Sequence, residues 1–257
     1  AQENLLEKER MEYELELARD IQESILPADL ALLKGFDFGA RMLPARMVGG
    51  DLYDMIQLDE ESVGISIGDV SDKGVAAAIF MSIFCSVLRA EAPHMDSPAE
   101  ALLRVNQHLL ELNDAGMFVT ALYGVLNRRT RTFSYARAGH HTPLLYDSAG
   151  KEIPIPHDHG QMLGFFSRPE LDTQTIDIPA GSTLLLYTDG MFDIMDENQE
   201  TFGEQRLREM ASTFREYTAQ EVCDRIVDSL KAYQGDNTQF DDMTLVAVRC
   251  CVDPDSD

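Results

Sequence analysis

Strand-like segments joined by short turn signals make up much of this chain, and helix-like segments group between and after them. Hairpin-linked strands pair antiparallel, because a parallel pair needs a long crossover between its strands. Helices that do not alternate regularly with single strands indicate an α+β fold, with antiparallel sheets and helices on their outer faces. We expect strands at 36–43, 52–58, 63–70, 117–127, 131–139, 142–147, 151–156 and 243–250, two more within 174–190, and helices at 75–92, 98–113, 203–214 and 218–232.

The N-terminal segment is charged and favours a helix over residues 3–26, which Pro27 ends because proline lacks a backbone N–H. Apolar side chains recur there every three or four residues and form one stripe. Two interpretations stay open: the helix packs on its own domain, or it pairs with a second chain as a coiled-coil-like linker. The stripe consists of Leu6, Tyr13, Leu17, Ile21 and Ile25, widened by Met11, Leu15 and Ala18.

The chain has 257 residues and a net charge of −24 at pH 7. This charge argues against nucleic acid and anionic membranes as partners, because both would repel such a surface. A phosphorylated substrate remains compatible if bound cations reverse the local charge. The longest apolar run, VAAAIFMSIFCSVL, falls short of the roughly 20 residues that cross a bilayer, and no signal peptide is visible. We therefore expect no membrane insertion.

The four cysteines form no CxxC pair, and two of them are adjacent. A zinc site is therefore not expected, and unpaired cysteines fit a reducing cytoplasm. The chain also starts without a methionine, inside a helix-like pattern. We interpret it as a fragment whose upstream sensory part has been removed.

Four short acidic stretches stand out, and three of them lie where an apolar strand ends or begins. Aspartates gathered from separate strand ends would repel one another strongly unless cations lay between them. Ligation by oxygen alone favours Mg²⁺ or Mn²⁺ over zinc or copper. Any one stretch is typical of a turn, but four together predict a metal site. The stretches are VGGDLYD (48–54), SIGDVSDKG (66–74), LYTDGMFDIMD (186–196) and QFDDMTLVAV (239–248).

With these stretches in place, the chain resembles the PPM-type metal-dependent serine/threonine phosphatases, in their bacterial sporulation and stress-response branch. The likeness runs from about Ile21 to Arg249. It implies an α-β-β-α sandwich over 28–252, an acidic tail at 253–257, and a helical dimerisation linker at 1–27 that follows a sensor or receiver domain. The motifs that carry it are ARDIQESILP, VGGDLYD, GDVSDKGVAAA, AGHHTPLLY, LYTDGMFD and FDDMTLVAV.

The resemblance also implies roles for individual residues around two Mn²⁺ or Mg²⁺ ions. Asp69 would bridge the metals, and Asp241 is favoured over Asp242 as the last carboxylate. Asp54 would accept a hydrogen bond from metal-bound water. The implied metal ligands are Asp51, Asp69, the carbonyl of Val70, Asp189 and Asp241 or Asp242, and Asp51, Asp69, Asp189 and Asp241 would serve catalysis. Arg46 is a weak candidate for binding the substrate phosphate. Its interpretation as a solvated loop arginine is favoured.

By the same resemblance, the chain would hydrolyse a phosphoserine or phosphothreonine through a metal-activated water. The implied substrate is an anti-sigma-factor antagonist, and the implied assembly is a homodimer formed by the N-terminal helix. Two other functions share features with this sequence. GGD is similar to the loop of bacterial nucleotide cyclases, but Leu52–Tyr53–Asp54 follows it here and TDG and DDMT would have no purpose. A catalytically silent partner-binding module of the same fold is the main alternative.

The histidines allow two interpretations each. His140 and His141 in AGHH fit a structural glycine-histidine turn better than a catalytic role. His157 and His159 form HDH, which could bind a transition metal, although a position in a proline-bounded loop favours a surface segment.

Overall fold

The strands form two antiparallel sheets packed face to face. The computed structural model describes residues 2–27, 29–30 and 32–251, so the predicted tail at 253–257 lies outside the described residues. Every pair of neighbouring strands is antiparallel. One sheet has the order β1 (Phe36–Leu43), β9 (Met243–Cys250), β8 (Thr183–Tyr187), β6 (Leu144–Tyr146); the other has β2 (Leu52–Gln57), β3 (Ser62–Val70), β4 (Val119–Asn127), β5 (Thr132–Ala138), β7 (Asp172–Asp177).

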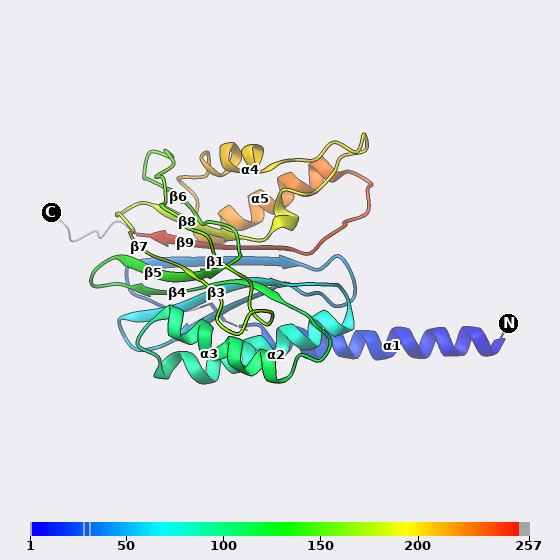
Figure 1. Ribbon diagram of the computed structural model, residues 1–257. Coiled ribbons are helices and arrows are strands. Elements are labelled where there is room, and N and C mark those ends of the chain that lie inside the picture. Colours follow the sequence, from blue (N-terminus) through cyan, green and yellow to red (C-terminus); the bar gives the residue numbers. More distant parts are fainter. Residues whose placement is uncertain (1, 28, 31, 252–257) are drawn as a thin grey trace.

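Helices cover the outer face of each sheet, as Figure 1 shows. The five-stranded sheet carries α2 (Val75–Glu91), the short η1 (Ala92–His94) and α3 (Pro98–Glu111), and the four-stranded sheet carries α4 (Glu204–Ala211) and α5 (Ala219–Gln234). The predicted α-β-β-α sandwich is thereby confirmed. The helix α3 begins where the sequence predicts, because the Ser97 hydroxyl accepts a hydrogen bond from the Glu100 amide at 3.2 Å.

Three apolar layers hold the sandwich together. The central layer lies between the sheets and includes Ile67, Leu122 and Val246. The outer layers lie under the helices, one around Phe84 and the other around Ile226. Alternate residues of a strand point to opposite faces of its sheet. Each sheet can therefore contribute apolar side chains both to the central layer and to the outer layer under its helices.

The most apolar helical stretch belongs to this core. Residues 75–94 are long and apolar enough to span a bilayer by composition alone. In the structure Met81, Phe84 and Leu88 are fully buried in the apolar layer beneath the five-stranded sheet. The composition therefore reflects burial on the sheet and against α3.

One expectation about strands was wrong, and the expected strands within 174–190 form in an arrangement that the sequence left open. Residues 151–156 form no strand beside β6, and their only pairing with it is an isolated bridge between Tyr146 and Glu152. The two strands expected within 174–190 both form, as β7 and β8, but they belong to different sheets. The Pro-Ala-Gly turn at 179–181 therefore carries the chain from one sheet to the other.

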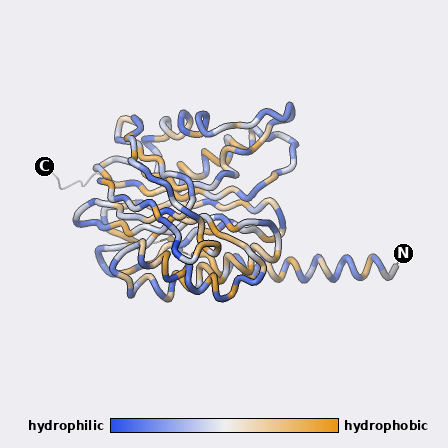
Figure 2. Tube along the Cα trace, viewed as in Figure 1, coloured by the Kyte–Doolittle hydropathy of each residue, from blue (hydrophilic) through white to orange (hydrophobic). Residues whose placement is uncertain are grey.

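The N-terminal helix α1 (Gln2–Ile25) projects away from the sandwich (Figures 1 and 2). Most of its apolar side chains from Leu5 to Ile21 are exposed, and Leu15 and Ala18 are half-buried, whereas Ile25 packs against the core beneath α2. The interpretation that the helix packs on its own domain therefore holds for its C-terminal end alone. The stripe along the rest of α1 is uncovered in this single chain.

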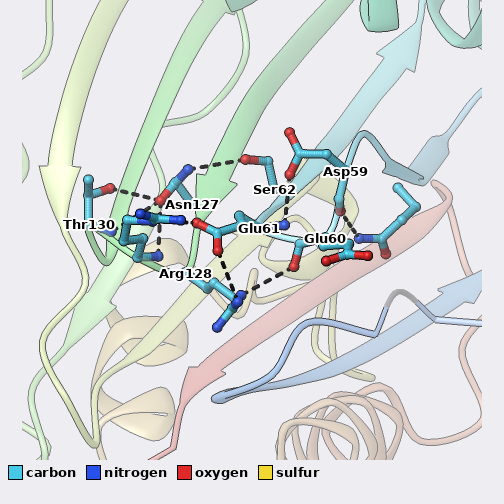
Figure 3. Close-up of polar contacts among 9 residues, drawn as sticks. Asp59, Glu60, Glu61, Ser62, Asn127, Arg128 and Thr130 are labelled. Carbon is cyan, nitrogen blue, oxygen red and sulfur yellow. Dashed lines mark hydrogen bonds and ion pairs between the residues drawn. The ribbon is translucent and has the colours of Figure 1, made fainter.

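The turn between β2 and β3 is hydrogen-bonded to the turn between β4 and β5 (Figure 3). Glu61, between β2 and β3, accepts hydrogen bonds from Arg128 at 3.0 Å and Arg129 at 2.6 Å. Asn127 donates to the Ser62 hydroxyl at 3.1 Å and accepts from the amide of Thr130. These turns are opposite to the ends of β2 and β3 that carry the acidic stretches, so they serve structure at a distance from those stretches.

Candidate metal centre

Four predicted ligands lie at strand ends that face each other across the two sheets. Asp51 immediately precedes β2, and Asp69 is the penultimate residue of β3, its antiparallel neighbour. Asp189 follows β8 at the start of η2 (Asp189–Met191), and Asp241 lies two residues before β9. One pair of carboxylates therefore comes from each sheet.

Asp51 joins the two sheets directly. Its carboxylate is buried at the start of β2, and its Oδ2 accepts hydrogen bonds from the hydroxyls of Thr188 at 2.8 Å and Thr244 at 2.5 Å. These threonines belong to the ends of β8 and β9, and the Thr244 amide donates to the Thr188 hydroxyl. Oδ1 of Asp51 receives no hydrogen bond from the described residues. The carboxylate is thus fixed by one oxygen and open at the other.

Sequence reasoning did not find the two threonines. Both stand inside the quoted motifs, Thr188 in LYTDGMFD and Thr244 in FDDMTLVAV. The available signal was a hydroxyl residue directly before or shortly after a motif aspartate at a strand end. The role of such a hydroxyl depends on which carboxylate from a distant part of the chain lies within hydrogen-bond distance. The motifs do not give this information.

The carboxylates are close enough in space to raise one another's pKa values. Burial, and then the charges of Asp189 and Asp241, raise the pKa of Asp69 to about 7, against a partial offset from Lys73. The pKa of Asp51 is also well above its ordinary value, because the side chain is buried and faces the charges of Asp69 and Asp242. A divalent cation between such groups would favour their ionised forms.

The doubled acid at 241–242 divides into two different environments. Asp242 is buried and accepts hydrogen bonds from three backbone amides, those of Ala45 at 2.7 Å, Gly50 at 2.8 Å and Asp51 at 3.4 Å. Asp241 is part-exposed and pairs with Lys73 at 2.9 Å. The Asp242 carboxylate therefore fastens the loop before β2. At Asp241, a metal ion could replace Lys73 as the partner of the carboxylate.

Each of the paired glycines before Asp51 allows a close approach to a different group. A Cβ on Gly49 would lie 2.2 Å from Oδ2 of Asp242, and one on Gly50 would lie 3.0 Å from the carbonyl oxygen of Val70. Glycine at 49 thus lets the loop close over the Asp242 carboxylate. The carbonyl of Val70, a predicted ligand at the end of β3, lies against Gly50.

Asp54 has a different setting from the other motif aspartates. It lies inside β2, buried, and Arg89 of α2 donates to its two oxygens at 2.6 and 2.9 Å. The same guanidinium donates to the carbonyl of Ile25 at the end of α1. The predicted contact of Asp54 with metal-bound water stays a prediction, and the contact that the structure shows is this ion pair.

Among the described residues, the histidines and Arg46 form no hydrogen bond or ion pair with these carboxylates. His140 is buried, and burial together with His141 lowers its pKa to about 3, so it is neutral at physiological pH. Its Nδ1 lies 3.2 Å from the Thr120 hydroxyl. His141 stacks on Tyr187. Arg46 is exposed, as are His157 and His159.

The donor set suits a hard divalent cation, although it is not a closed cage. Within residues 2–27, 29–30 and 32–251, no three His, Cys, Asp or Glu side chains are already arranged to hold a metal ion. The groups that face one another are carboxylates and one carbonyl, the ligands that Mg²⁺ and Mn²⁺ prefer. The open Oδ1 of Asp51 and the raised pKa of Asp69 are the features that a cation would satisfy.

A sandwich of two antiparallel sheets flanked by helices, with acidic strand ends from both sheets at one edge, defines the class of PPM-type phosphatase domains. Within that class, a model of the Stage II sporulation protein E (SpoIIE) family matches residues 59–250. The chain belongs to the SpoIIE family, and the predicted membership of the sporulation and stress-response branch is confirmed.

Individual relatives agree with this assignment. Protein IcfG of Synechocystis sp. is 32% identical over 264 residues, which cover 91% of this chain and 41% of IcfG. Phosphoserine phosphatase RsbU of Bacillus subtilis is 28% identical over 245 residues, covering 94% of this chain and 71% of RsbU. The solved SiaA-PP2C domain of Pseudomonas aeruginosa has the same fold, with a TM-score of 0.78 at 24% identity over 94% of this chain and 98% of that domain. The chain thus spans less than half the length of IcfG.

Proposed function

We propose that this chain is a metal-dependent phosphatase that hydrolyses a phosphoserine or phosphothreonine on a regulatory protein. The observation that carries the proposal is the set of mutually repelling carboxylates at facing strand ends of a SpoIIE-family fold. The relative RsbU is named a phosphoserine phosphatase, which supports the same reaction here.

The proposed ligands of two Mn²⁺ or Mg²⁺ ions are Asp51, Asp69, the Val70 carbonyl, Asp189 and Asp241. Asp69 would hold a central place in this set, because burial and the charges of Asp189 and Asp241, which come from the other sheet, raise its pKa. When bound, such a pair of ions supplies an activated water nucleophile and neutralises charge on the phosphoryl group. Asp242 is left out of this set, because three backbone amides already occupy its carboxylate.

The protein's own residues would orient the ligands and the phosphoryl group. Thr188 and Thr244 hold one oxygen of Asp51, which would leave the other oxygen available to a cation. Lys73 is held by Asp241 and by the carbonyl of Phe240 at 2.7 Å. With a cation bound at Asp241, the ammonium group of Lys73 would lose this ion pair, keep its contact with the Phe240 carbonyl, and be available to pair with a phosphoryl oxygen.

We further propose an anti-sigma-factor antagonist as the phosphorylated partner, in line with the branch of the family.

We also propose a homodimer through α1 and a regulatory domain upstream of it. The exposed apolar side chains of Leu6, Tyr13 and Leu17 support the dimer, because an uncovered stripe on a projecting helix favours pairing. Sedimentation equilibrium of the chain and of Leu17→Asp tests it, and a monomer at all concentrations for the unmodified chain would refute it.

The decisive experiment measures hydrolysis of p-nitrophenyl phosphate and of a phosphorylated antagonist, with Mn²⁺ and with EDTA. We expect Mn²⁺-dependent release of phosphate, reduced to background in Asp69→Ala. Asp228→Ala, which removes an exposed carboxylate from α5, is the matched control and should retain activity. Binding of the antagonist without hydrolysis, at any Mn²⁺ concentration, would instead establish the catalytically silent module.

A further inference from the structure

A cavity of about 500 Å³ opens directly beside the candidate metal centre. One wall is the segment 190–201, which follows Asp189, and the other is the segment 237–241, which ends in a proposed ligand. Three lining residues, Gly190, Asp193 and Asp241, adjoin or belong to the acidic cluster. The cavity is therefore continuous with the place where a phosphoryl group would be bound.

Local hydrogen bonds preform both walls. The first wall turns back on itself through the bridge between Met195 and Thr201. The second wall is fastened to the first, because the side-chain amide of Asn237 donates to the carbonyl oxygen of Asp196. Gln239 also donates to the carbonyl of Asp241 at 2.8 Å. The cavity thus exists before any substrate binds, which reduces the entropy lost on binding.

The cavity presents apolar side chains on both walls. Ile194 and Met195 lie on one side, and Phe240, with 82% of its surface exposed, lies on the other. The Nζ atom of Lys73 lies 5.7 Å from the centre of the Phe240 ring. The same ammonium group donates a hydrogen bond to the backbone carbonyl oxygen of Phe240. The exposed aromatic side chain beside the cavity offers contact area that a bound molecule would cover.

Building on the proposed function, we infer that this cavity binds an apolar side chain next to the phosphorylated residue of the protein substrate. A cavity of this volume measures about 8 Å across, and an extended chain advances about 3.3 Å per residue. The bound side chain therefore lies within about three residues of the phosphorylated one. Acidic neighbours are disfavoured, because Asp193 and Asp241 line the inner end and the whole chain carries a charge of −24.

The test compares substrates that differ only beside the phosphate. Phosphoserine peptides in a glycine-serine background would carry one leucine, lysine or glutamate at each neighbouring position in turn. With Mn²⁺ present, we expect leucine at one position to raise kcat/KM about tenfold over glycine, the order of effect of burying one apolar side chain. No preference for leucine, or a preference for lysine or glutamate, would overturn the inference.

Variants of the two walls locate the effect. Phe240→Ala keeps the carbonyl that holds Lys73, and Met195→Ala truncates the opposite wall. Each should lower kcat/KM for the leucine peptide relative to that for p-nitrophenyl phosphate, which has no neighbouring residues, by about tenfold. Phe165→Ala is the control, because Phe165 is an exposed phenylalanine outside the cavity and should leave this ratio unchanged. An equal loss on both substrates for Phe240→Ala would contradict a docking role.

The two proposals fail in distinguishable ways. If neither p-nitrophenyl phosphate nor any peptide is hydrolysed with Mn²⁺, the proposed function is wrong. If both are hydrolysed without a leucine preference, the function stands and the docking cavity is wrong. The peptide series on the unmodified chain gives this answer even if a variant fails to fold.

Discussion

The side-chain amide of Gln22 donates a hydrogen bond to the carbonyl oxygen of Gly49 at 2.6 Å, and the Gly49 amide donates back to Gln22 at 3.1 Å. Gln22 is only 5% exposed and lies near the end of α1, within the ARDIQESILP motif. Gly49 in turn lies against the Asp242 carboxylate. The projecting helix is therefore tied to the loop that presents Asp51.

Replacing Gln22 tests that connection. Gln22→Ala leaves two buried backbone groups of Gly49 without partners, which we expect to cost about 2 kcal/mol of unfolding free energy. Because the loop carries Asp51, the dissociation constant for Mn²⁺ should also rise about tenfold. Urea unfolding and calorimetric Mn²⁺ titration measure the two effects. Ser24→Ala, an exposed neighbour on α1, should change neither, and wild-type values for Gln22→Ala would show the contact to be incidental.

The two acids before β9 should separate into a ligand and a structural residue. Asp242→Ala removes the acceptor of three backbone hydrogen bonds and should cost at least about 2 kcal/mol of unfolding free energy in EDTA. Asp241→Ala removes a part-exposed ion pair with Lys73 and should change that stability by less than about 1 kcal/mol. Titration with Mn²⁺ should nevertheless show weaker binding for Asp241→Ala. The reverse pattern would assign Asp242 as the ligand.

The Arg89–Asp54 ion pair should stabilise the core of the five-stranded sheet. Arg89→Ala leaves the buried Asp54 carboxylate without its charged partner, at a cost of about 3 kcal/mol, the low end for a buried pair because Arg89 is partly exposed. Arg104→Ala, which breaks an exposed pair with Glu91, is the matched control at below about 1 kcal/mol. Chemical denaturation compares them. Equal, small costs would mean that water replaces Arg89 at Asp54.

Stability without metal should fall as the pH rises from about 4 to about 7. In this window folded Asp69, with its pKa raised to about 7, retains a proton that the unfolded chain has lost. The unfolded state binds fewer protons, so each increase in pH favours unfolding. The Tm in EDTA should therefore decline across the window, less steeply in Asp69→Asn. Mn²⁺ should reverse the decline, and an Asp69→Asn profile parallel to wild type would contradict the assignment.

The sequence by itself determined the helices, all but one of the expected strands, and the positions of the acidic residues along them. Turn residues and the alternation of apolar side chains act over a few neighbours, so they predicted β3, α3 and the β4–β5 hairpin correctly. The same local signals placed Asp51, Asp69 and Asp189 at strand ends. They also predicted the helix α1 while leaving two interpretations of its apolar stripe.

Only the tertiary structure decided what those residues contact. Strand signals do not say which sheet a strand joins, so the separation of β7 from β8 could not be read from the turn between them. Thr188 and Thr244 meet Asp51 across more than a hundred residues of sequence because two sheets pack face to face. Side-chain pairing at such separations follows from packing, in which a carboxylate binds whichever donor the opposite sheet brings within hydrogen-bond distance.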